Sequence, residues 1–206
     1  MAGNTTLEAI RKNQILDAAL RIIGERGAPN VTMDDIASAA EMSKGGVAHY
    51  FSSKDALFLD AVKMFYDRIF ERGKETRDQF NDPLEKLLSF TWLYNWEDPE
   101  MMMGYRLLFD FQALAAHDDR YSRLYHEWVE NWIRLLKDAI EEGAESGLFL
   151  VKDADSAART VSAIYHGIAN GKTDPVGIFY ILSRDIQNEI PKVVNMDDAT
   201  DPIFLF

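Results

Sequence analysis

The chain has 206 residues, a net charge of −12 at pH 7 and no cysteine, which excludes disulfides and thiolate metal sites. Hydrophobic residues make up 47% of it and charged residues 27%, a composition typical of an ordered globular protein. The first residues lack the apolar stretch of a secretory signal, and no later run is long enough to span a membrane. We therefore expect a cytoplasmic protein.

Apolar residues recur at helical spacing along most of the chain, and the alternation typical of strands is scarce. Proline, glycine and capping residues divide this pattern into about nine helices. The sequence therefore predicts an all-α fold. We expect an N-terminal domain of three helices at 1–52, a connecting helix at 53–72, a helical bundle at 73–190 and a tail at 191–206.

Two capping boxes mark helix starts near the N-terminus. Thr5 with Glu8 predicts the start of the first helix, and Thr32 with Asp35 predicts the start of a short helix over 33–40. In each pair the hydroxyl and the carboxylate satisfy amides that would otherwise lack a partner.

Further helices follow in chain order. A second short helix is expected over 44–51, then a long helix capped by Ser52 and ending near Gly73. The longest helix is expected over 118–142, before the glycines at 143 and 147. Three Asp-Pro pairs place a cap before a proline and predict further helix starts at Asp82-Pro83, Asp98-Pro99 and Asp174-Pro175.

The segment from Thr32 to Tyr50 has the layout of a helix-turn-helix. Gly45 and Gly46 are unusual there, because glycine costs roughly 1 kcal/mol in helix propensity. Close approach of the backbone to base edges explains them, and a tight connector is the alternative. The net charge argues against DNA binding, yet residues 42–54 contain no acid.

Residues 15–62 resemble the amino-terminal DNA-binding segment of TetR-family transcription regulators. The match covers the apolar face of the first helix and Ile36-Ala37, and it includes Gly27, Thr32, Ser43-Lys44-Gly45, Tyr50-Phe51 and Lys54-Asp55-Ala56-Leu57. The resemblance implies a homodimer that binds a palindromic site on double-stranded DNA. It also implies a repressor that a small-molecule effector releases from that site.

The resemblance also implies roles for individual residues. Lys44 and Gly45 would lie against base edges and Ala48 would add a methyl contact, whereas Val47 and Phe51 are expected in the core. Hydroxyls, helix-start amides and the remaining polar groups would contact phosphates. The expected DNA-contact residues are Thr32, Ser43, Lys44, Gly45, Ala48, His49, Tyr50 and Lys54. Few basic residues lie near them, so we expect a shallow salt dependence.

Aromatic residues and methionines are dense beyond residue 75. Core packing accounts for most of them, but the resemblance implies an effector pocket in this part of the chain. Its expected lining is Trp92, Trp96, Met103, Phe109, Phe111, Trp128, Trp132 and Tyr165. A neutral hydrophobic or amphipathic effector is the first expectation. An aromatic-walled cation site, aided by Glu97, Glu100, Asp110 and Glu127, is the alternative.

A stripe of small and apolar residues near the C-terminus is the expected dimer interface. It comprises Ala157, Ala158, Ile164, Gly167 and Gly171, with Ile178 and Ile181 from a ninth helix. A buried seam within one chain is the alternative.

Enzymatic function is not expected. No histidine follows a glutamate by three positions, so the di-iron signature is absent. The acidic run at 197–201 fits a solvated turn better than a magnesium site. We expect no catalytic residue, metal or cofactor. A helical adaptor that has lost DNA binding is the alternative function, because of the net charge.

Overall fold

The computed structural model describes residues 2–171 and 203–204, and the chain folds as two compact units. The first comprises Met1–Phe70 and Glu97–Trp128, and the second Glu71–Trp96 and Val129–Phe206. Apart from one pair of two-residue strands, the described residues form helices and loops, which confirms the predicted all-α class. None of the described helices is both long and apolar enough to cross a membrane. The ninth helix, the Asp174-Pro175 start and the acidic run lie outside the described residues.

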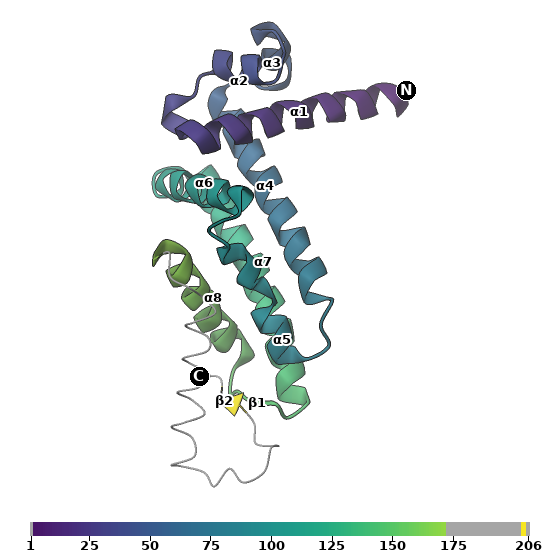
Figure 1. Ribbon diagram of the computed structural model, residues 1–206, viewed down its shortest axis with the longest axis vertical. Coiled ribbons are helices and arrows are strands. Elements are labelled where there is room, and N and C mark those ends of the chain that lie inside the picture. Colours follow the sequence, from purple (N-terminus) through teal and green to yellow (C-terminus); the bar gives the residue numbers. More distant parts are fainter. Residues whose placement is uncertain (1, 172–202, 205–206) are drawn as a thin grey trace. The chain divides into compact units, whose positions relative to one another are not determined.

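The first unit is built around α1 (Ala2–Arg26). Figure 1 shows α2 (Met33–Ala39) and α3 (Lys44–Tyr50) on one side of α1 and α6 (Pro99–Ala115) on the other. A short 3-10 turn, η1 (Ala28–Asn30), joins α1 to α2. Burial of apolar side chains holds these helices together, and those less than 2% exposed include Ile15, Ala19, Ile36 and Val47.

Helix starts follow the predicted caps in part. The Thr32 capping box is present: the Asp35 amide donates to Thr32 Oγ1 over 3.2 Å, and the Thr32 amide donates to Asp35 Oδ2 over 2.9 Å. The predicted start at Thr5 was wrong, because α1 is already helical from Ala2 and a cap residue must leave the helix. The predicted cap at Ser52 was wrong by one residue, since the amide of Ala56 donates to Ser53 Oγ, which makes Ser53 the cap.

The turn between α2 and α3 depends on Glu41. Its φ of 54° lies in the left-handed region, which costs a non-glycine residue roughly 1–2 kcal/mol. The amide of Met42 then donates to the carbonyl of Ala37 over 2.9 Å, which closes the end of α2. This turn sets the angle at which α3 leaves α2.

α6 is fixed to the C-terminal end of α1. The guanidinium of Arg106 donates to the carbonyl of Gly24 over 3.0 Å, and the amide of Ala28 donates to Asp110 Oδ2 over 2.7 Å. Gly24 permits the close approach, because a Cβ there would collide with Met103. The end of α1 therefore follows the position of α6.

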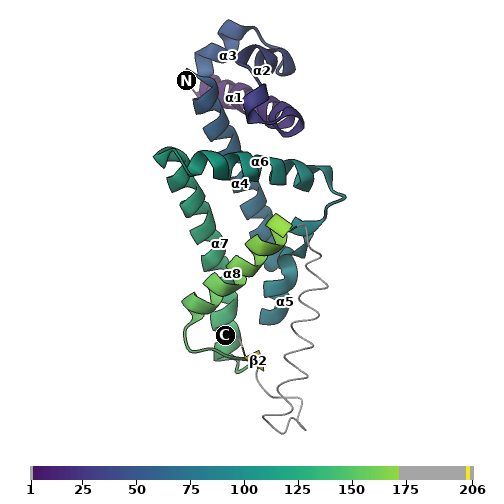
Figure 2. The same ribbon diagram turned by 90° about the vertical axis from the view of Figure 1, so that its left-hand side faces the viewer.

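The second unit contains the end of α4 (Lys54–Arg77), α5 (Pro83–Leu88), η2 (Ser89–Tyr94), the C-terminal part of α7 (Asp119–Glu145) and α8 (Ala154–Gly171). Figure 2 shows α8 beside that part of α7, where Arg159 forms two bonds to Glu130, of 2.7 and 3.1 Å. Strands β1 (Phe149–Leu150) and β2 (Ile203–Phe204) pair in parallel.

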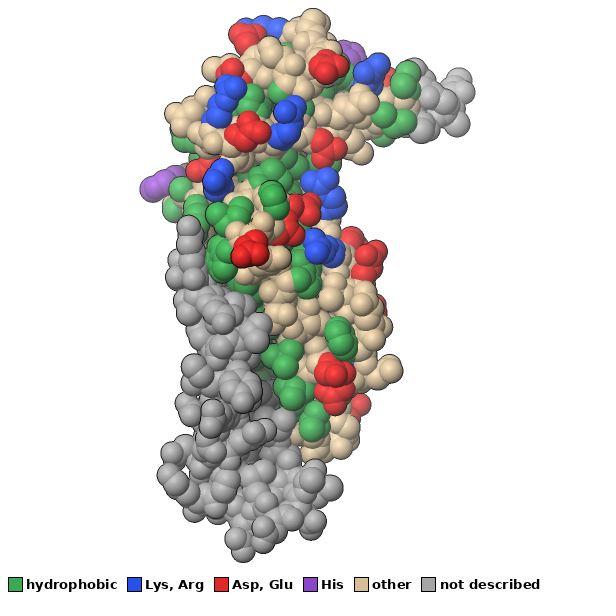
Figure 3. Space-filling view, in the orientation of Figure 1, with side chains coloured by type: hydrophobic (Ala, Val, Ile, Leu, Met, Phe, Trp, Pro, Cys, Tyr) green, Lys and Arg blue, Asp and Glu red, His purple; other side chains and the backbone are tan. Residues whose placement is uncertain are grey.

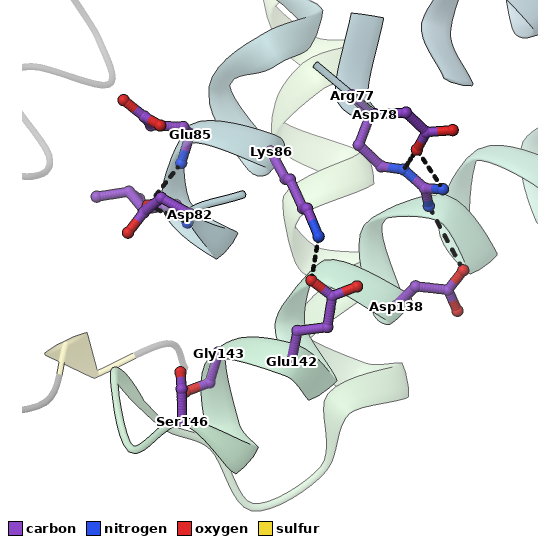
Figure 4. Close-up of polar contacts among 10 residues, drawn as sticks. Arg77, Asp78, Asp82, Glu85, Lys86, Asp138, Glu142, Gly143 and Ser146 are labelled. Carbon is purple, nitrogen blue, oxygen red and sulfur yellow. Dashed lines mark hydrogen bonds and ion pairs between the residues drawn. The ribbon is translucent and has the colours of Figure 1, made fainter. Parts of the chain in front are cut away.

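Polar contacts join the helices of this unit (Figure 4). Asp82 caps α5 by accepting from the amides of residues 84 and 85. Lys86 of α5 pairs with Glu142 of α7, and Arg77 at the end of α4 reaches Asp138 of α7 over 3.5 Å. These pairs tie α4 and α5 to the same stretch of α7.

Two glycines expected to mark helix ends lie inside helices. At Gly73 a Cβ would lie 2.5 Å from Trp132 Cη2, and at Gly143 it would collide with Phe149. Each glycine makes room for an aromatic ring, so α4 runs on to Arg77 and α7 to Glu145. The Asp-Pro starts at Pro83 and Pro99 are confirmed.

Candidate nucleic-acid interface and effector site

Helix α3 presents one face to solvent. Lys44, Gly45, Ala48 and His49 are exposed, whereas Val47 is fully buried. Tyr50 is half-buried, and its ring meets that of His49 edge to face, with centroids 5.2 Å apart. The burial of Val47, and of Phe51 directly after the helix, agrees with the sequence prediction. Four of the residues expected to contact DNA, which are Lys44, Gly45, Ala48 and His49, therefore share the exposed side of α3, whereas Thr32 caps α2 and Lys54 begins α4.

The two glycines of α3 have different surroundings. A Cβ at Gly46 would lie 3.3 Å from Met42 Cε and from Ser43 Oγ, so packing favours glycine there. A Cβ at Gly45 would meet nothing within 4 Å. Neither packing nor a positive φ calls for glycine at position 45.

Two hydroxyls expected near phosphates already serve as caps. Thr32 donates its hydroxyl hydrogen to Asp35 Oδ2 over 2.6 Å, and Ser43 Oγ accepts from the amide of Gly46 over 3.1 Å. Hydrogen bonds from Thr32, aided by Arg26, hold the pKa of Asp35 below its ordinary value of 3.8. Asp35 is therefore ionised at neutral pH, and Thr32 and Ser43 orient the starts of α2 and α3.

Lys54 is the first residue of α4 and is half-buried. Its ammonium donates to the carbonyls of Ala28 and Val31, each over 2.9 Å. Two of its three donors thus hold the η1 turn against the start of α4, and one remains for a phosphate.

A pocket of about 230 Å³ lies in the first unit, next to the η1 turn, which forms part of its lining. Its walls include Lys54, Phe58, Asp110, Leu114 and Tyr121. The charged residues of the lining are engaged within the chain, since Asp110 accepts from the amide of Ala28, Lys54 donates to the turn, and Asp55, also in the lining, pairs with Arg120. No cluster of side chains suited to a metal ion occurs in the described part of the chain.

The aromatic residues expected to line one effector pocket fall into two groups. In the first unit, Phe111 and Trp128 lie around Tyr66, with ring centroids 5.6 and 4.6 Å from its ring. Also in this unit, Met103 lies against Gly24, and Phe109 is 43% exposed. The remaining four, which are Trp92, Trp96, Trp132 and Tyr165, belong to the second unit.

The aromatic residues of the second unit pack mainly on one another. Trp132 meets Phe90 edge to face at 5.3 Å, and the Tyr165 hydroxyl donates to the carbonyl of Leu87 over 2.5 Å. The guanidinium of Arg72 covers the ring of Trp92 at 4.0 Å, so that face is already occupied by a cation. Trp96 is half-buried. This group stabilises the bundle.

Tyr66 has no hydrogen-bond partner for its hydroxyl among the described residues, although its side chain is buried. Burial raises the pKa of Tyr66 well above its ordinary value, so the group stays neutral. We call Tyr66 and its neighbours, which are Tyr105, Phe111, Tyr125 and Trp128, the Tyr66 cluster. Tyr66 was not among the residues predicted from the sequence to line the effector site. The feature that could have indicated it is a hydroxyl group on the otherwise apolar side of α4.

These features define an all-α protein with an N-terminal helix-turn-helix and a helical C-terminal part. Residues 15–61 match the family described as bacterial regulatory proteins, tetR family. Residues 85–170 match the BetI-type transcriptional repressor, C-terminal family. The chain belongs to the TetR family and is a transcription regulator, not an enzyme.

Named relatives extend over most of the chain. The regulator BetI of Burkholderia cenocepacia is 31% identical over 164 residues, which is 79% of this chain and 81% of the relative. The regulator PksA of Bacillus subtilis is 28% identical over 172 residues, or 82% of each chain. A regulator from Saccharomonospora viridis, solved in complex with choline, has a TM-score of 0.70 at 24% identity, covering 78% of this chain and 84% of that one.

Proposed function

We propose that this protein is a cytoplasmic homodimeric repressor that binds a palindromic operator through α3 and leaves it when a small amphipathic effector binds. The observation that carries the proposal is the exposed face of α3, where Gly45 leaves open space beside Lys44. Because Gly45 has no side chain, the backbone at the start of α3 can approach base edges. Lys44 can donate to guanine O6 and N7. The residue assignments made from the sequence are kept, with Lys54 and Thr32 acting partly through the turn and cap they hold.

α8 supports the dimer. Ala157 and Ala158 are buried within their own chain and are not available to a partner. An exposed stripe of small residues, Ser156, Thr160, Ala163 and Gly167, remains at helical spacing on the opposite side. Such a stripe lets two helices approach closely, so we assign the interface to it.

The Tyr66 cluster is the proposed effector site. A buried hydroxyl without a partner costs free energy that a ligand hydroxyl or carbonyl would recover, while the rings would hold an apolar or cationic part. A small organic cation is the second candidate, because the C-terminal region matches the BetI-type family and a structural neighbour was solved with choline.

α6 offers a route from effector to DNA. Tyr105 and Phe111 on this helix belong to the cluster, while Arg106 and Asp110 hold the end of α1. A ligand that separates the rings would move α6, and with it α1 and the motif that packs on it. Operator release would follow from this shift in orientation.

Selection of binding sites by the full-length protein from a random duplex library tests the DNA-binding function. Recovery of a two-fold symmetric sequence is expected. Recovery of no enriched sequence would contradict the proposal and favour a helical adaptor.

Calorimetry tests the effector with choline and its neutral carbon isostere, dimethylbutanol. Binding of choline alone supports the cation, and binding of both supports a neutral amphipathic effector. Tyr66→Phe should weaken the binding of whichever compound binds the wild type. Equal binding by wild type and this variant would exclude the cluster's hydroxyl from the site.

A further inference from the structure

The basic residues of the DNA-binding region are engaged within the chain. Residues 1–60 hold six Lys and Arg, and each makes a polar contact with another residue of this region. Their acceptors are Gln14, Asp60, the Ala39 carbonyl, Asp35, Asp34 and the η1 carbonyls. On the face drawn in Figure 3, Lys and Arg side chains alternate with Asp and Glu over the N-terminal helices. Free positive charge for phosphates is therefore scarce.

One of these pairs lies on the proposed reading face. The ammonium of Lys44, at the start of α3, is 2.9 Å from Asp34 Oδ2 on α2. Both side chains are exposed, at 68% and 64%, so the pair is open to an incoming duplex and is held only weakly. The carboxylate of Asp34 thus lies within reach of whatever Lys44 contacts.

We propose that Asp34 is a specificity-determining residue that suppresses phosphate-driven binding through Lys44, and this rests on the proposed role of Lys44 at the operator. A phosphate offers only negative charge, so it must displace Asp34 and is repelled by it. A base-pair edge offers donors as well as acceptors. Lys44 can donate to guanine while Asp34 accepts from a cytosine amino group, so the pair fits a base edge but opposes a phosphate.

The test compares Asp34→Asn with Asp60→Asn in the full-length protein. Asp60 is a matched control, because it also pairs with a lysine, Lys12, but between α1 and α4. Affinity is measured for the selected operator and for a scrambled duplex over a series of salt concentrations. Thermal unfolding of each variant checks that the fold is kept.

Asp34→Asn should raise affinity for the scrambled duplex about five- to tenfold, the scale of one surface charge interaction, and steepen its salt slope by about one counterion. Affinity for the operator should rise less than affinity for the scrambled duplex, or should fall, so that the ratio of operator affinity to scrambled-duplex affinity decreases. Asp60→Asn should change both duplexes alike. In a Lys44→Ala background, the effect of Asp34→Asn should shrink to that of the control.

Other results overturn the inference in distinguishable ways. An Asp34→Asn effect equal to that of Asp60→Asn, or equal on both duplexes, removes Asp34 as a specificity residue. Unchanged operator binding by Lys44→Ala removes the assigned reading site. Absence of DNA binding by the wild type removes the proposed function itself.

Discussion

At the scale of single residues, Gly45 is the most informative position, since its surroundings leave room for a side chain that the sequence does not supply. Gly45→Ala should stabilise the fold by about 0.5 kcal/mol through helix propensity. The same methyl would hold α3 away from base edges and lower operator affinity by about tenfold, the loss of roughly one base contact. Denaturant unfolding and fluorescence anisotropy measure the two effects. A variant that gains stability and binds as before would show that position 45 faces no partner.

The motif residues could be predicted because their signals are local. A capping box such as Thr32 with Asp35 lies within four residues, and the pattern of glycines and buried positions lies within one short helix. The pairing of Lys44 with Asp34 could not be predicted, because it depends on the angle between α2 and α3 and hence on the left-handed turn at Glu41. Tyr66 was missed because its neighbours come from two helices that lie far from it in the sequence, α6 and α7.

At the scale of elements, the η1 turn depends on Lys54. Lys54→Met should destabilise the protein by about 2 kcal/mol, because two carbonyls lose a charged donor. Lys63→Met is the control, since that ammonium pairs with exposed Asp67 and its loss should cost about 0.5 kcal/mol or less. Chemical denaturation measures both. A Lys54→Met protein as stable as wild type, with a shallower salt slope on DNA, would instead make Lys54 mainly a phosphate contact.

The start of α7 is tied to the start of α4 by Arg120, which bonds Asp118 and Asp55 over 2.6 Å each. Hydrogen bonds from the Arg120 guanidinium, and then from the Arg120 backbone amide, lower the pKa of Asp118 from 3.8 to about 2. Because the folded pKa is depressed, this contact stabilises the fold above pH 3.8 and is lost as the pH falls towards 2.

Arg120→Ala should therefore raise the pKa of Asp118 by about one pH unit or more and bring acid unfolding to higher pH. Carboxyl NMR titration measures the pKa. Arg123→Ala, which removes only a weaker and more distant charge effect, should leave the pKa nearly unchanged. Equal shifts in both variants would mean that the direct bonds to Arg120 do not hold the carboxylate.

Helix boundaries show where local sequence signals fail. The Asp-Pro starts of α5 and α6 were predicted because cap and proline act within one turn. Gly73 and Gly143 look like helix ends in sequence, but each makes room for an aromatic ring that is distant in the chain or follows a loop. Such packing glycines are recognised only once the partner ring, here Trp132 or Phe149, is placed.

At the scale of the whole molecule, binding to both half-sites of a palindromic operator requires a dimer, which we assign to the exposed stripe of α8. Ala163→Arg should yield monomers and reduce operator affinity by about a hundredfold, because the second half-site no longer binds as part of one molecule. Glu145→Arg, on the exposed end of α7, should remain dimeric. Sedimentation velocity measures both variants. A wild-type chain that is monomeric at micromolar concentration would contradict the assigned interface.

Whether α3 reads DNA is decided by the operator affinity of Lys44→Ala compared with that of Lys152→Ala. Each variant removes one exposed lysine, the first from α3 and the second from the loop before α8. If α3 reads base edges, Lys44→Ala should bind the selected operator at least about thirtyfold more weakly, with little loss of affinity for scrambled duplex, while Lys152→Ala should match wild type on both. Equal operator affinity in all three proteins would contradict DNA reading by α3.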